Sequence, residues 1–112
     1  MQQISIIETK LTYLQENILI ELNKTANAPF ICKKFNIKPI TLSKAIQSLV
    51  DKNMITDGVL TERGKKMVHY LEFRNETISL FLKKQRILIT DELTKQMCAL
   101  DYKIIIALRN LL

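Results

Sequence analysis

Apolar residues recur every three or four positions in the first part of the chain, which is the spacing of one apolar stripe along a helix. This spacing predicts a helix over residues 4–24. A short second helix is predicted over residues 30–35, beginning near Pro29, because the fixed φ angle of proline suits a first helical turn. The stripe of the first helix consists of Ile4, Ile7, Leu11, Leu14, Ile18 and Leu22.

A longer third helix is predicted over residues 40–53. Pro39 opens it, and only residues 36–38 separate it from the second helix. Its apolar positions again recur with helical spacing, so this helix has one inward and one outward side. We expect Leu42, Ala45, Ile46, Leu49 and Val50 to face inward, and Thr41, Ser43, Lys44, Gln47, Ser48 and Lys52 to face outward.

Turn residues place a hairpin directly after the third helix. The dipeptide Asp57-Gly58 favours a type I′ turn, and the apolar residues on either side predict two very short strands. Thr61 is then expected to cap a long helix that reaches about Ile87. Thr90, followed by two acidic residues, is expected to cap a last helical segment whose apolar positions continue to Leu112.

The order of these elements indicates the fold class. A helix, a short helix, a three-residue turn, a longer helix and a tight hairpin follow one another in winged helix-turn-helix domains. Only two glycines and two prolines occur in 112 residues, which fits a mainly α chain better than a β-sandwich or barrel. We therefore predict a winged helix-turn-helix DNA-binding domain over residues 1–70 and a helical dimerisation region over residues 71–112.

The amino-acid composition indicates which cellular compartment and which type of partner to expect. Seventeen Lys and Arg against eleven Asp and Glu give a formal charge of +6, and a basic surface attracts polyanions such as DNA. The two cysteines are far apart and form no CxxC motif, so a reducing compartment is expected. The N-terminus has no basic segment typical of a signal peptide, and no apolar run reaches about 18 residues. We expect a cytoplasmic protein with no membrane partner.

The third helix carries the candidate chemistry. In helix-turn-helix proteins the N-terminal half of this helix reaches base edges, while the preceding helix crosses the DNA backbone. Hydroxyl and amide side chains can read bases, with Gln pairing bidentately with adenine, and lysines can neutralise phosphates. A polar helix face of this kind is also typical of a solvated surface. The candidate contacts to double-stranded DNA are Lys33, Lys34, Lys38, Pro39, Ile40, Thr41, Ser43, Lys44, Gln47 and Lys52.

Several stretches of the chain resemble one known family. Residues 30–66, which end in the phrase LTERGKK, resemble the winged-helix domain of the iron- and manganese-dependent repressors, the family of the diphtheria-toxin repressor and the manganese-transport regulator. Residues 70–84 and 91–104 are similar to the dimerisation helices of that family. The resemblance covers nearly the whole chain, although LTERGKK also occurs in other winged-helix regulators. It implies a dimeric repressor that Fe²⁺ or Mn²⁺ controls.

The metal ligands that the resemblance implies are largely missing. Family members hold the metal through His and carboxylate side chains, which suit Fe²⁺ and Mn²⁺. Asn75 and Tyr102 stand where the family has histidines, and of the N-terminal acidic pair only Glu8 lies nearby. Cys98 and Asp101 remain, and we expect them to share one face of a helix. We therefore expect no metal or other cofactor, with Cys98 and Asp101 as the candidates that remain for Mn²⁺ or Fe²⁺.

The C-terminal third contains more apolar residues than one side of a helix can bury. Residues 80–82 and 104–106 are runs of three apolar residues, so we expect a homodimer to cover them unless they complete the core of the monomer. A transcription regulator that represses is the leading hypothesis. The alternative is a winged-helix module that binds another protein and not DNA. An enzyme is not expected, because the chain has a single histidine, His69, and neither a Gly-rich loop nor a nucleophile motif.

Overall fold

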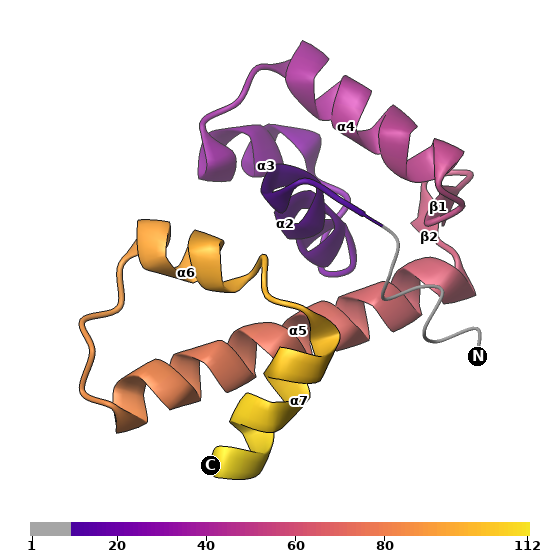
Figure 1. The fold of residues 1–112 in the computed structure, drawn as a ribbon. Helices are drawn as coiled ribbons and strands as arrows, with labels where there is room; N and C mark the ends of the chain where they lie inside the picture. Colours follow the sequence, from indigo (N-terminus) through magenta and orange to yellow (C-terminus); the bar gives the residue numbers. More distant parts are fainter. Residues whose placement is uncertain (1–9) are drawn as a thin grey trace. The chain divides into compact units, whose positions relative to one another are not determined.

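The computed structural model describes residues 10–112, and Figure 1 shows the arrangement as a ribbon. Over this range the chain forms six helices and one antiparallel pair of short strands, which confirms a mainly α fold with a small hairpin. The elements are α2 (Tyr13–Leu22), α3 (Ala28–Phe35), α4 (Pro39–Asp51), β1 (Ile55–Thr56), β2 (Val59–Leu60), α5 (Glu62–Lys84), α6 (Asp91–Met97) and α7 (Tyr102–Leu111).

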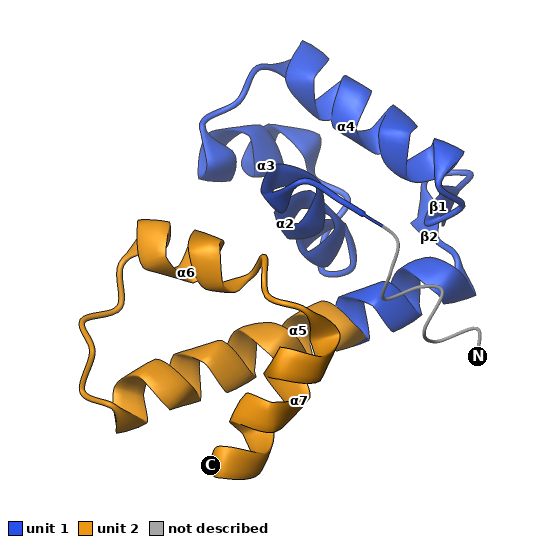
Figure 2. Ribbon diagram, viewed as in Figure 1, with its two compact units in different colours: residues 1–69 blue, residues 70–112 orange. Residues whose placement is uncertain are grey.

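The chain divides into two compact units, residues 1–69 and residues 70–112. Figure 2 shows them in blue and orange, and the division falls within the long helix α5. The first unit holds α2, α3, α4 and the hairpin, and the second holds α6, α7 and the C-terminal part of α5. The roles expected for the two parts of the sequence, DNA binding and dimerisation, stay predictions.

Helix α2 begins later than the apolar spacing predicted. Thr12 caps it: its hydroxyl accepts the backbone N–H of Gln15 at 3.1 Å, and the side chain of Gln15 accepts the backbone N–H of Thr12 at 2.9 Å. This reciprocal pair satisfies two donors that a helix start leaves free. A continuous helix over 4–24 is therefore wrong, because residues 10–12 are not helical. Residues 4–9 of that prediction lie outside the described residues.

The short turn between α3 and α4 depends on one residue in the left-handed conformation. Asn36 has φ 53° and ends α3, and the backbone N–H of Ile37 donates to the carbonyl oxygen of Cys32 at 3.0 Å. Asn tolerates this conformation better than most residues with a side chain, and the bond satisfies a carbonyl at the helix end. Pro39 then opens α4, as the sequence predicted.

Helix α4 packs against both α2 and α3, and these contacts form the core of the first unit. Leu42, Ala45 and Leu49 face inward as predicted, against a core that includes Ile18 and Ile31. Val50 was expected to face inward, but its side chain is exposed. The helix turns inward only one side, and Val50 lies at its margin, one residue beyond Leu49.

The hairpin has the predicted turn. Ile55 pairs with Leu60 and Thr56 pairs with Val59, so only two residues form the connection. Asp57 and Gly58 have φ angles of 50° and 78°, and positive φ at both central positions defines the type I′ turn. Thr61 follows as the predicted cap, because its hydroxyl accepts the backbone N–H of Gly64 at 3.0 Å.

The second unit packs around Ile78 and Leu82 of α5 and Ile105 of α7. The sequence predicted one helical segment from residue 91 to residue 112, and this is wrong. Helix α6 ends at Met97, and Asp101 begins α7 by accepting the backbone N–H of Lys103 at 3.1 Å. An Asp cap that starts a new helix competes with continuing the previous one.

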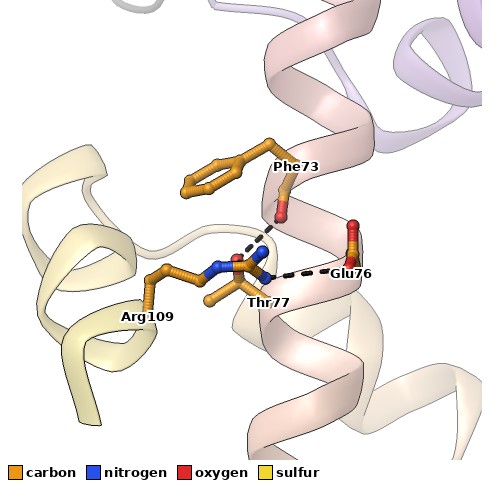
Figure 3. A network of polar contacts seen from close by, with 4 residues as sticks. All are labelled: Phe73, Glu76, Thr77 and Arg109. Carbon is orange, nitrogen blue, oxygen red and sulfur yellow. Dashed lines mark hydrogen bonds and ion pairs between the residues drawn. The ribbon is translucent and has the colours of Figure 1, made fainter. Parts of the chain in front are cut away.

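Arg109 ties α7 to α5, as Figure 3 shows. Its Nη1 lies 3.8 Å from Oε1 of Glu76 and 3.5 Å from Oγ1 of Thr77, and its guanidinium carbon lies 5.2 Å from the ring centre of Phe73. The hydroxyl of the buried Thr77 donates to the carbonyl oxygen of Phe73 at 2.8 Å. Contacts of three kinds, an ion pair, a hydrogen bond and a cation–π contact, therefore link the Arg109 side chain to α5.

We expect Arg86→Gly to stabilise the second unit by about 0.5–1 kcal/mol. Arg86 has φ 58° at the end of α5, where the backbone N–H of Ile87 donates to the carbonyl oxygen of Leu82 at 2.9 Å. The left-handed conformation costs a residue with a Cβ about 1–2 kcal/mol, and glycine avoids this cost. Part of the gain is offset because glycine loses more conformational entropy on folding. Urea unfolding followed by circular dichroism measures the change. A lower midpoint in the variant would contradict it.

Candidate nucleic-acid interface

The outer side of α4 carries most of the candidates for DNA contact. Helix α4 lies at the outer edge of the first unit in Figure 1, with α2 and α3 on its other side. Lys38, Pro39, Ile40, Ser43, Lys44 and Gln47 are all exposed. Ile40 is 62% exposed although it is apolar. The residues from Ile40 to Gln47 recur at helical spacing, so they form one continuous face.

Two residues predicted to face outward are turned toward the protein instead. The hydroxyl of Ser48 accepts the side-chain amide of Gln15 at 2.9 Å. The ammonium of Lys52 donates to the carbonyl oxygen of Lys10 at 2.8 Å and lies 3.4 Å from Oε1 of Gln15. The structure therefore engages Lys52 within the protein, away from the exposed face. Thr41 is also half-buried.

Helix α3 contributes two candidate lysines that differ in their surroundings. Lys33 is exposed. The ammonium of Lys34 lies 2.7 Å from Oε2 of Glu21, a carboxylate that is almost completely buried on α2. A buried carboxylate needs such a partner, so Lys34 has a structural role. Within residues 10–112, no ion pair is found for Lys33, Lys38 or Lys44.

One residue of the face escaped the sequence analysis. Asp51 is exposed, and its Oδ1 accepts the side-chain amide of Gln47 at 3.0 Å. The bond occupies a donor that could read a base, and the carboxylate adds a negative charge at the C-terminal end of the face. The signal was available in the sequence, because residues four apart on a helix are neighbours.

The hairpin adds little to this face. Its tip consists of Asp57 and Gly58, both exposed, and Val59 on β2 is exposed as well. A tip of two residues with one carboxylate offers phosphates no positive charge. The hairpin is therefore short, and the charge at its tip is negative.

The residues at the place of the implied metal site do not fit a metal ion. Arg74 is 3% exposed, and its guanidinium donates to Oδ1 of Asn75 at 2.9 and 3.2 Å and to the carbonyl oxygen of Cys98 at 3.3 Å. The thiol of Cys98 lies 3.5 Å from the same Oδ1. A permanent positive charge therefore already uses the oxygen atoms that a cation would need.

The other residues that could hold a metal ion either have a structural role or do not lie together. Asp101 caps α7 and Cys98 ends α6, so the expectation that they share one face of a single helix is wrong. His69 is exposed on α5. Within residues 10–112, no three His, Cys, Asp or Glu side chains gather closely enough to hold a metal ion. Glu8 lies outside the described residues.

Comparison of the chain with models of protein families, with curated proteins and with solved structures finds no match. The resemblance to the metal-dependent repressors therefore stays an expectation from the sequence. Among the helices of residues 10–112, none combines the length and apolar character needed to cross a membrane.

Proposed function

We propose that this protein is a winged-helix transcription regulator, a repressor, that binds double-stranded DNA as a homodimer in the cytoplasm. One observation carries the proposal. Helix α4 follows a three-residue turn and presents an exposed face with two lysines that have no ion pair within residues 10–112, Lys38 and Lys44, beside Ser43 and Gln47. Such a helix fits the major groove, where its first turns reach base edges.

The proposal divides the work among the residues of this face. Lys33, Lys38 and Lys44 bind phosphates, which position the protein without reading sequence. Ser43 and Gln47 reach bases, and Gln47 pairs with adenine once it leaves Asp51. Because the hairpin tip is short and acidic, α4 reads the DNA with little help from the wing.

Exposed apolar residues in the second unit support the homodimer. Leu80 on α5 and Ile104 and Leu111 on α7 are all exposed. Surfaces of this kind usually have a partner. A twofold dimer would present two α4 helices to half-sites about one helical turn of DNA apart, at roughly 34 Å.

Selection of bound DNA from a random pool tests the function. We expect the selected DNA to contain an enriched inverted repeat. We also expect a log–log plot of affinity against salt concentration to have a slope of about −5, because each of the lysines that bind phosphates, three on each protomer of the dimer, releases about one counterion. No enrichment together with no salt dependence would overturn the proposal.

We expect Asp51→Asn to raise the affinity for the selected DNA about fivefold, because the change removes a negative charge that lies 3.0 Å from the side-chain amide of Gln47. The amide introduced by this change keeps an acceptor for Gln47, so Asp51→Ala should raise the affinity further. Fluorescence anisotropy at constant salt measures both. The control is Glu72→Gln, an exposed carboxylate of the second unit, which should bind as the parent does.

We expect Mn²⁺ or Fe²⁺ to leave DNA affinity unchanged within a factor of about two. The reason is that the guanidinium of Arg74 donates to Asn75 and to the carbonyl oxygen of Cys98, two residues at positions where the resemblance places metal ligands. Titration of DNA with and without each metal, and with a chelator, measures this. A tenfold gain with either metal would show that metal control survives.

The second candidate function is a winged-helix module that binds another protein. The short acidic hairpin tip and the exposed Val59 beside it favour this reading. It predicts a complex that is insensitive to salt and no binding of any DNA, whereas phosphate contacts weaken steeply as salt rises.

A further inference from the structure

The connection between α5 and α6 carries three consecutive exposed apolar side chains, and one of them, Leu88, is the most exposed large apolar side chain of the second unit. Helix α5 ends at Lys84, and Arg86 turns the chain away with φ 58°. Residues 87–90 are neither helical nor part of a strand. Ile87, Leu88 and Ile89 are 44%, 81% and 46% exposed. Exposing three consecutive apolar side chains to water is unfavourable in free energy. A segment of this kind is typical of a surface that binds a partner.

Charges of opposite sign stand on the two sides of these apolar residues. Lys83 and Lys84 lie in the last turn of α5, with Arg86 just beyond it, and Asp91 and Glu92 lie in the first turn of α6. All five are exposed. The helix dipoles favour this placement, since cations suit the C-terminal end of a helix and anions the N-terminal end. The segment therefore reads basic, apolar, acidic along the chain.

We propose that residues 83–92 form a twofold contact between two copies of this chain, with Leu88 next to the symmetry axis. In an antiparallel twofold pairing, each residue i of one copy meets residue j of the other while j meets i. Such a pairing sets the basic end of each segment against the acidic end of the other and brings the two Ile-Leu-Ile runs together. The order of charges makes this segment complementary to itself.

The same charges disfavour other partners. A polyanion or an anionic membrane would attract Lys83 and Arg86 but repel Asp91 and Glu92, which lie within a few residues of the apolar tip. A second copy satisfies both groups at once. Like charges that meet directly cost binding energy, and opposite charges fix the register.

The contact extends along one neighbouring element. The ammonium of Lys84 donates to the carbonyl oxygen of Leu111 at 3.0 Å, so the end of α7 lies beside the end of α5. Leu111 and Leu112 are exposed there. Stable interfaces bury roughly 800 Å² on each partner, which three side chains do not supply. We therefore expect the pairing to be weak in the free protein, with dissociation in the micromolar range or above.

This inference rests on the proposed function in one respect. It assumes that the contact between residues 83–92 of two copies is the contact that brings two α4 helices to DNA. Self-association of the free protein is measured without DNA, so the two ideas fail separately. A dimer without DNA binding leaves the contact standing and removes the function. If the protein binds an inverted repeat but its self-association does not depend on residues 83–92, the proposed function stands and the proposed contact is wrong.

Reciprocal charge reversal tests the contact. One variant carries Lys83→Glu and Arg86→Glu, and the other carries Asp91→Lys and Glu92→Lys; Lys84 is left intact because it holds the end of α7. Each variant alone faces like charges and should associate at least tenfold more weakly than the parent in analytical ultracentrifugation. An equimolar mixture should regain a dimer that contains one of each. Parent-like association of both single variants, or no association in the mixture, would overturn the proposal.

Cross-linking gives a second measurement that does not depend on these charges. Leu88→Cys, in a chain with Cys32→Ser and Cys98→Ser, should form a disulfide-linked dimer within minutes in a glutathione redox buffer, because a residue at a twofold axis meets its own copy. Val59→Cys in the same background is the control, since Val59 is also well exposed but lies on the hairpin. Equal cross-linking at both positions would count against the proposed axis.

Discussion

Replacing Gly64 by alanine is expected to lower the free energy of unfolding of the first unit by about 3 kcal/mol, the upper end of what overpacking usually costs. Gly64 lies in the first turn of α5, and an added Cβ would stand 2.1 Å from the carbonyl oxygen and 3.1 Å from the carbonyl carbon of Met54. That oxygen already accepts the backbone N–H of Thr61 at 3.0 Å. No side-chain rotation relieves a clash between two backbones, so the hairpin and the helix would have to separate.

Gly58 provides the matched control for this prediction. A Cβ there meets nothing within 4 Å, and its φ of 78° is the only obstacle. Gly58→Asn should therefore cost less than about 1 kcal/mol, because Asn adopts positive φ more readily than other residues with a side chain. Urea unfolding of both variants gives the comparison. Equal stability of Gly64→Ala and the parent would show that α5 starts without this close approach.

The double change Lys44→Ala and Gln47→Ala is expected to lower affinity for the selected DNA at least about a hundredfold. A bidentate contact between Gln47 and adenine contributes about 1–3 kcal/mol, and the twofold dimer makes it twice. Lys44→Ala alone should reduce the salt slope by about two, one counterion for each protomer. Electrophoretic mobility shift or anisotropy at several salt concentrations measures both quantities.

The chain offers a matched control for this double change as well. Lys95 and Gln96 form a neighbouring lysine and glutamine on the exposed side of α6, in the second unit. Replacing both by alanine changes charge and polarity in the same way but leaves α4 intact. DNA affinity should then stay within about twofold of the parent. A loss as large as that of the α4 variant would mean that charge alone, wherever it lies, determines binding.

The elements that the sequence predicted well depend on residues close together in the chain. The start of α4 at Pro39 follows from the fixed φ of proline, and the two-residue hairpin follows from Asp57-Gly58. The caps at Thr61 and Thr90 are likewise confirmed. Each of these signals acts within about four residues, so no knowledge of the tertiary structure was needed.

The wrong predictions share a different cause. Apolar spacing continued from residue 4 to residue 24 and from 91 to 112, but Thr12 caps the start of α2 and Asp101 caps the start of α7 within those ranges. A side chain that caps a helix competes locally with the periodic pattern. The periodicity of apolar residues indicates which residues face the core. It does not reveal where one helix ends and another begins when the same residues stay buried.

The exposed face of α4 was predictable only as a set of outward positions. Lys44 and Gln47 are exposed as expected, whereas Lys52 and Lys34 bind partners that are 42 and 13 residues away in the sequence. No local rule finds such partners. Of the five candidate lysines, Lys33, Lys38 and Lys44 have no ion pair within residues 10–112, and Asp51 adds a negative charge beside Gln47.

Gln15 has a consequence for redesign of this protein. Its side chain joins the start of α2 to Ser48 and Lys52, so α4 is fastened to the unit through its C-terminal turns. The first turns, with Ile40, Ser43 and Lys44, carry no such polar link in the described residues and point to solvent. These positions can be randomised together while the helix keeps its attachment. We expect the molecule to serve in this respect as a scaffold on which these exposed residues of α4 can be varied without changes to the residues that hold the helix.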